Sequence, residues 1–197
     1  MTVSPLAWLR NQPQVVEADF VTEANQQLAS TQVQMPLILQ TDERWFYDSY
    51  GTDEQDNFLG VNGCALASLA MVGSYWQNRY IEPVEILGWS QNHYYLPGQG
   101  TTWSIFSDYA HAIGMTSQDL GNDFVTAKQF AASGYPVLVS VKAGYFTDIG
   151  HIMVLMANAT GEIIVYDPND APEKRHYAQT FSDELFLNEA INYWVYQ

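Results

Sequence analysis

Cys64 is the only cysteine of the chain, and it stands where a helix is expected to begin. Asn62-Gly63 is a turn signal, and residues 65–76 contain neither a charge nor a proline, which predicts a helix buried on all sides. The start of a helix carries unpaired N–H groups and the positive end of the helix dipole, which favour a thiolate. Cys64 is therefore a candidate nucleophile. The alternative is a small buried hydrophobic side chain, which is the usual role of a free cysteine.

A histidine begins and an aspartate ends the β-hairpin that the sequence predicts over residues 151–167. If Met156 pairs with Glu162, His151 lies directly opposite Asp167, with both side chains on one face of the sheet. A carboxylate beside an imidazole fixes its tautomer and stabilises the imidazolium that accompanies a thiolate. Taken singly, His151 is better explained as a core histidine at the start of a strand, and Asp167 as part of an ordinary turn after a strand; the catalytic interpretation is favoured only when both are taken together with Cys64.

Gln40 follows the apolar run 35–39, which is expected to form a short strand or an extended segment. Its side chain therefore emerges from a backbone that is anchored in the core. An uncharged amide can donate to a developing oxyanion without acting as a competing base. The alternative for Gln40 is a solvated glutamine at the edge of a strand.

The elements that must position these residues follow an order of helices first and strands afterwards, which predicts an α+β fold. The helical part carries the cysteine, and an antiparallel sheet carries the histidine and the aspartate. Thr101 or Thr102 is expected to cap one helix, and Thr126 the next. Helices are expected near 20–29, 65–76, 83–89, 103–113, 126–132 and 182–190, and strands near 136–141, 151–157, 162–167 and 191–196. The Gln-rich residues 1–34 are expected to form an amino-terminal extension or linker, and residues 35–197 the compact domain.

Composition excludes several classes of partner. The chain of 197 residues has 7 Lys and Arg against 22 Asp and Glu, a formal charge of -15, which repels nucleic acid and anionic lipids. A single cysteine allows neither an internal disulfide nor a cysteine-cluster metal site. The acidic residues 53–57 lack the ligand spacing of a calcium loop, so neither a metal nor a cofactor is expected. No apolar run approaches the roughly 20 residues of a membrane span.

Six motifs occur in the order found in papain-like cysteine peptidases. They are most similar to those of bacterial family thirty-nine, the bacteriocin-processing double-glycine peptidases, and of its stand-alone branch. The resemblance covers about residues 35–170 and implies the papain-like peptidase fold. The motifs are Gln40 to Trp45, Asn62 to Val72, Gly100 to Trp103, Gly134 to Val137, Gly150 to Leu155, and Asp167-Pro168.

The resemblance implies a role for each candidate residue. Cys64 is similar to the family's nucleophile, His151 to its general base and Asp167 to the acid that orients the base, while Gln40 resembles the side-chain donor of the oxyanion hole. Two features depart from the family pattern: Ala65-Leu66 stands where many relatives have Gly-Pro, and a long acidic loop separates Gln40 from Cys64. Cleavage of double-glycine leaders is therefore not part of what the resemblance implies here.

The sequence accordingly predicts a thiol-dependent hydrolase that cleaves peptide or amide bonds, with a peptide or protein as its substrate. Two alternatives stay open: an acyltransferase that uses the same thioester, and a catalytically silent binding module on the same fold. Residues 1–11 lack a basic leader followed by an apolar core, so no signal peptide is expected. The expected location is cytoplasmic by default, and extracellular if Met1 is not the natural start. The sequence predicts no oligomeric state.

Overall fold

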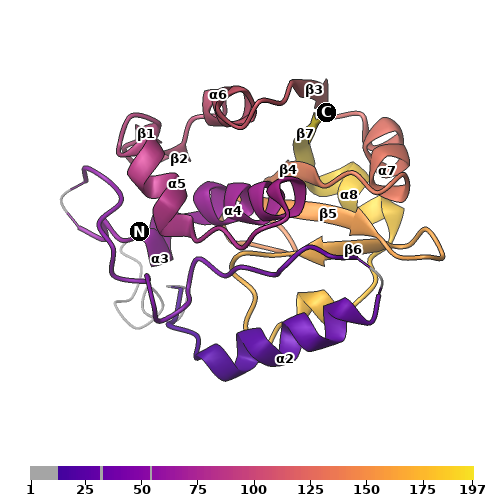
Figure 1. Ribbon diagram of the computed structural model, residues 1–197, viewed down its shortest axis with the longest axis horizontal. Helices are drawn as coiled ribbons and strands as arrows, with labels where there is room; N and C mark the ends of the chain where they lie inside the picture. The colour runs from indigo at the N-terminus through magenta and orange to yellow at the C-terminus, as the bar shows by residue number, and fades with distance from the viewer. Residues whose placement is uncertain (1–12, 32, 54) are drawn as a thin grey trace, which may run out of the picture.

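The fold is built on a five-stranded antiparallel sheet with helices on both faces (Figure 1). The computed structural model describes residues 13–31, 33–53 and 55–197. The strand order in the sheet is β3-β7-β4-β5-β6, and a separate two-stranded hairpin joins β1 and β2. The helices are α2 (Ala18–Ala29), α3 (Leu59–Asn62), α4 (Cys64–Gln77), α5 (Pro83–Ser90), α6 (Ser104–Ala112), α7 (Phe124–Ala132), the 3₁₀ turn η1 (His176–Ala178) and α8 (Asp183–Glu189). The strands are β1 (Tyr95–Leu96), β2 (Gly100–Thr101), β3 (Ser117–Gly121), β4 (Val137–Val141), β5 (His151–Ala157), β6 (Ile163–Tyr166) and β7 (Ala190–Tyr196).

The two faces of the sheet bury two separate hydrophobic clusters. Along β5, Ile152 and Val154 point to the cluster that contains α4, whereas Met153 and Leu155 point to the cluster that contains α7 and α8. Successive side chains of a strand point to opposite faces, so a strand covered on both sides must be apolar throughout. This explains why β4 is apolar except for Ser140 and β5 except for His151 at its start, and why every residue of the two strands except Ala157 is buried.

Helix α4 begins at Cys64, as predicted, and almost its whole length is buried. Its N-cap residue, Gly63, lies so close to the preceding turn that a Cβ atom there would collide with the carbonyl oxygen of Leu59. No side chain caps this helix, so the first turn keeps free N–H groups. The helix ends where Asn78 takes a left-handed conformation, with φ 51°.

The register of the β5–β6 hairpin differs from the prediction by two residues. Met156 pairs with Ile164 rather than with Glu162. The turn lies one residue later in the chain than predicted, because Ala157 pairs with Ile163, the Asn158 N–H donates to the Glu162 carbonyl over 3.0 Å, and Gly161 supplies the positive φ of 81°. A shift by two residues leaves every side chain on its original face of the sheet.

Two predicted helix caps are wrong. The cap of α7 is Asp123, whose carboxylate accepts the Thr126 N–H over 3.0 Å, so the helix begins before Thr126. Helix α6 has no side-chain cap bond from either Thr101 or Thr102. The Thr101 hydroxyl instead bonds to the hydroxyl of Tyr50 over 2.7 Å. The Thr101 hydroxyl therefore makes a tertiary hydrogen bond in place of the helix cap that the local sequence pattern predicts.

Helix α2 makes hydrogen bonds to the segment that precedes Gln40. The Asn25 side chain accepts the Leu37 N–H over 2.7 Å and donates to the Leu37 carbonyl over 3.0 Å. On its other side α2 contacts η1, where the Phe20 and Tyr177 rings pack edge to face with their centroids 5.7 Å apart. The predicted extension over residues 1–34 lies partly outside the described residues. Within the described ranges, no helix has the length and apolar character needed to cross a membrane.

Candidate active site

The sulfur of Cys64 lies at the free N-terminal end of α4. The residue is partly exposed, whereas the helix behind it is buried in the core. No acidic residue occupies the first turn, and among residues 13–31, 33–53 and 55–197 no side chain caps the N–H groups there. The positive end of the helix dipole therefore lies at the sulfur without a competing acidic residue in the first turn.

His151 and Asp167 form a buried ion pair at the neighbouring end of the β5–β6 hairpin. The His151 Nε2 atom lies 2.7 Å from Asp167 Oδ1, and both side chains are almost completely buried. An ionised carboxylate only accepts hydrogen bonds, so Nε2 carries the hydrogen of this bond. The other ring nitrogen, Nδ1, is left for the sulfur of Cys64. The predicted approach of His151 to Asp167 thus occurs despite the two-residue difference in register.

The charges of this pair shift both pKa values strongly. Burial of the His151 ring acts against its protonation, but the charge and hydrogen bond of Asp167, together with the neighbouring Cys64 side chain, raise its pKa to about 10. Burial also acts against ionisation of Asp167, yet the contacts with His151 and His176 hold the pKa of this carboxyl well below its usual range. The raised pKa of His151 favours the protonated ring, which is the form a general acid needs.

Gln40 connects the two turns that flank the site. Its Nε2 atom donates to the carbonyl oxygens of Gly60, over 2.9 Å, and Val61, over 3.2 Å, in the turn before Cys64. Its backbone N–H donates to the Pro168 carbonyl, over 2.8 Å, in the turn after Asp167. The side chain is buried, and within the described part of the chain its Oε1 atom has no hydrogen-bond partner. The structure thus places Gln40 in contact with the turn before Cys64 and with the turn after Asp167. The N–H groups of its side-chain amide donate to backbone carbonyls.

A residue that the sequence did not single out, His176, completes the surroundings of Asp167. The His176 Nδ1 atom lies 2.8 Å from Asp167 Oδ2, the oxygen that His151 does not use. The Asn169 N–H adds a third hydrogen bond, of 2.7 Å, to Oδ1. The sequence signal for His176 is weak, because it lies in a loop with no regular spacing to either partner.

Four aromatic residues, Trp45, Tyr47, Trp103 and Tyr145, are candidates from the sequence for the walls of a substrate cleft, and they fall into two groups. Trp45 is buried and donates through its indole N–H to the Leu39 carbonyl over 2.8 Å, which makes it a core residue. Tyr47, Trp103 and Tyr145 are exposed. They remain predictions as walls of a substrate cleft.

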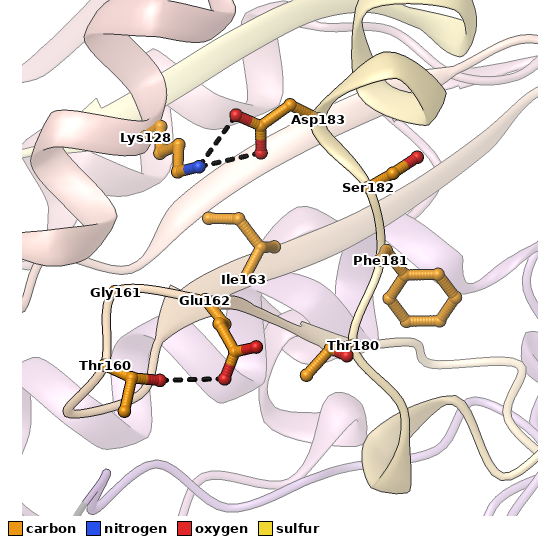
Figure 2. A pocket seen from close by; sticks show the side chains of 9 residues that line it. All are labelled: Lys128, Thr160, Gly161, Glu162, Ile163, Thr180, Phe181, Ser182 and Asp183. Carbon is orange, nitrogen blue, oxygen red and sulfur yellow. Dashed lines mark hydrogen bonds and ion pairs between the residues drawn. The ribbon is translucent and has the colours of Figure 1, made fainter.

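A separate hollow of about 410 Å³ lies at the opposite end of β6 from Asp167 (Figure 2). Figure 2 shows the Lys128–Asp183 ion pair on one side of it and the hydrogen bond between Thr160 and Glu162 on the other. None of the four predicted site residues lines this hollow. Over residues 13–31, 33–53 and 55–197, no group of three or more His, Cys, Asp or Glu side chains is arranged to hold a metal ion.

Comparison with solved structures shows the same overall fold in a bacterial protein. A crystal structure from Bacillus anthracis, provisionally described as a C39-like peptidase, aligns over 84% of this chain and 95% of its own, with 15% identity and a TM-score of 0.55. The peptidase domain of Streptococcus ComA, a bifunctional ABC transporter involved in quorum sensing, aligns over 76% of this chain and 96% of its own, with 19% identity and a TM-score of 0.48. None of the curated proteins compared with the chain matches it.

A family model gives the more specific result. The model described as the Peptidase_C39 like family matches residues 33–196, a range that contains every element from α3 to β7. The matched range also contains Gln40, Cys64, His151 and Asp167. The chain therefore belongs to the Peptidase_C39-like family and has the papain-like α+β fold of its cysteine peptidases.

Proposed function

We propose that this protein is a cysteine peptidase in which Cys64, His151 and Asp167 act as nucleophile, general acid–base and orienting acid. The observation that carries the proposal is the buried bond between His151 Nε2 and Asp167 Oδ1, which leaves the Nδ1 side of the ring for the sulfur. Membership of a peptidase family supports the same reaction class. A silent binding module would gain nothing from an imidazolium held beside a partly exposed thiol.

The reaction follows from the placement of these groups. The Cys64 thiolate attacks the carbonyl carbon of the scissile amide, and the carbonyl oxygen takes up the negative charge. His151 Nδ1 then gives its proton to the leaving nitrogen, and the C–N bond breaks to leave a thioester. A water molecule gives a proton back to His151 as it attacks the thioester, and the acid product leaves with the sulfur restored as a thiolate.

The developing oxyanion needs donors, and two candidates lie at the start of α4. The Cys64 backbone N–H points out of the first turn of a helix without a side-chain cap. We assign the second donor to Gln40, whose amide already lies against the turn that precedes the nucleophile. This assignment requires one of its N–H groups to leave a backbone carbonyl when substrate binds. Removal of such a donor in other hydrolases costs about 2.7 to 4 kcal/mol of transition-state stabilisation.

The decisive variant is Cys64→Ala. We expect it to lower kcat/KM on a peptide-library substrate by on the order of 10⁴-fold or more, because the covalent route is lost. The fold should persist, since Cys64 supplies no cap bond and is only partly buried. Far-UV circular dichroism and thermal unfolding check the fold of the variant. For wild type, mass spectrometry of the products with and without an added amine acceptor separates hydrolysis from acyl transfer. Undiminished cleavage by a folded Cys64→Ala protein would refute the proposal.

A further inference from the structure

Asp167 is held from two sides by two different histidines. His151 Nε2 bonds to Oδ1 over 2.7 Å, and His176 Nδ1 bonds to Oδ2 over 2.8 Å. With the Asn169 N–H on Oδ1, the buried carboxylate receives three N–H hydrogen bonds. Because an ionised carboxylate has no hydrogen to donate, both imidazoles donate to it. One histidine faces the sulfur, whereas the other has no part in the reaction proposed above.

The position of His176 is fixed by its surroundings rather than by Asp167 alone. The Asp170 carboxylate accepts the backbone N–H groups of His176 and Tyr177, each over 3.0 Å, and so closes the turn that carries the ring. The ring packs on Tyr145 and Phe146, with centroids 5.8 and 5.5 Å away. These two aromatic residues belong to the segment that leads into β5 and His151. His176 therefore joins the loop of the acid to the loop of the base.

We propose that His176 is a positioning residue, whose Nδ1–H bond to Oδ2 fixes the rotation of the Asp167 carboxylate so that Oδ1 faces His151. The rotation of a carboxylate about its last side-chain bond is broad when only one oxygen is held. A donor on the second oxygen removes this freedom without competing for the oxygen that His151 uses. This inference rests on the proposed function, because it matters only if His151 acts on the Cys64 sulfur.

The matched variants that test it are His176→Asn and His176→Leu. Asparagine carries an N–H donor at nearly the position of Nδ1, whereas leucine has a similar size and branching but no donor. Both variants lose the ring and its aromatic contacts, so the comparison isolates the hydrogen bond. We expect kcat of the leucine variant to be about 10- to 100-fold lower than that of wild type, with little change in KM. We expect kcat of the asparagine variant to be close to that of wild type. The alkaline limb of the kcat/KM profile should move to lower pH in the leucine variant only.

A second readout needs no substrate. Because Cys64 is the only cysteine, the rate of alkylation by iodoacetamide reports the thiolate at this one position. We expect rapid alkylation at about pH 6 for wild type and for His176→Asn, and slower alkylation for His176→Leu. If leucine and asparagine variants of equal thermal stability show the same kcat, pH limb and alkylation rate, the positioning role is refuted. If wild type neither cleaves peptides nor alkylates rapidly, the proposed function itself fails.

Thermal unfolding separates positioning from a purely structural role. A structural histidine would lower the melting temperature of both variants and leave the kcat of the folded fraction unchanged, which would overturn the proposal. If the leucine variant does not fold, His176→Phe keeps an aromatic ring among Tyr145 and Phe146 and still lacks the donor. The phenylalanine variant is then compared with His176→Asn by kcat, by the alkaline limb of the kcat/KM profile and by the alkylation rate. Equal values for the two variants would again refute the positioning role.

Discussion

At the scale of single residues, the charge of His151 depends on one buried carboxylate. Burial by itself would hold the ring neutral, and the Asp167 charge reverses that preference and raises the pKa of His151 to about 10. A neutral amide in place of the carboxylate would keep the hydrogen-bond acceptor and remove the charge. The proposed thiolate–imidazolium pair should then exist over a much narrower range of pH.

Asp167→Asn tests this dependence. We expect the alkaline limb of kcat/KM, which should lie near pH 10 in wild type, to move down by more than about one pH unit, because burial then dominates the pKa of His151. The measurement is the pH profile of peptide cleavage, with a circular dichroism spectrum at each pH as the control for folding. An unmoved alkaline limb in the folded variant would contradict the assignment of His151 as the titrating base.

The same pair makes stability depend on pH in a definite direction. The pKa of His151 is raised above its unfolded value of about 6.5, so its contribution is complete below that pH and is lost as the pH rises through about 10. The pKa of Asp167 is lowered below its unfolded value of about 3.9, so its contribution is complete above that pH and is lost in acid. The difference in unfolding free energy between wild type and Asp167→Asn should therefore be largest between about pH 4 and 6.5.

At the scale of elements, α2 stabilises the segment that carries Gln40. Its Asn25 side chain satisfies both the N–H and the carbonyl group of Leu37, as a neighbouring strand would. The pair Arg175–Glu23, at 2.8 Å, joins α2 to the turn that contains His176, although both side chains are about half exposed and the pair adds little stability. Helix α2 therefore contacts two segments that lead to the site.

Asn25→Ala should expose this role. We expect the unfolding free energy to fall by about 1–3 kcal/mol, because two backbone groups of Leu37 lose their partner. Activity per folded molecule should fall as well, since the backbone before Gln40 is loosened. Urea unfolding and kcat are the measurements, and the exposed neighbour Gln26→Ala is the matched control. Equal effects of the two substitutions would show that the contact with Leu37 contributes nothing specific.

Local patterns were sufficient for the elements that carry the site and insufficient for the contacts between them. The charge-free run after Gly63 and the two apolar runs of the β5–β6 hairpin correctly placed Cys64 at a helix start and His151 beside Asp167. The hairpin register depended on the conformation of a single glycine, Gly161, which sequence spacing does not determine. His176 and the 3₁₀ turn that holds it depend on tertiary contacts with Asp170 and with aromatic residues from other segments. No local pattern contains such contacts.

At the scale of the whole molecule, the formal charge of -15 should select among substrates during their approach. We expect kcat/KM for a peptide flanked by lysines to fall severalfold as salt rises from about 0.05 to about 0.5 M, because screening removes the attraction. The same peptide core flanked by glutamates should show the opposite trend. Initial rates at low substrate concentration measure both, and a neutral peptide is the control. Identical salt dependence for the two peptides would exclude a steering role for the surface charge.

The place of β7 in the sheet bears on when activity can appear during synthesis. This strand lies between β3 and β4, and it is synthesised after the segments that carry Gln40, Cys64 and His151. Until residues 190–196 insert, β3 has no strand to pair with, and the two-sided covering of β4 is incomplete. A nascent chain therefore contains its thiol before the sheet behind that thiol is complete, so any activity is expected only after residues 190–196 have joined the sheet.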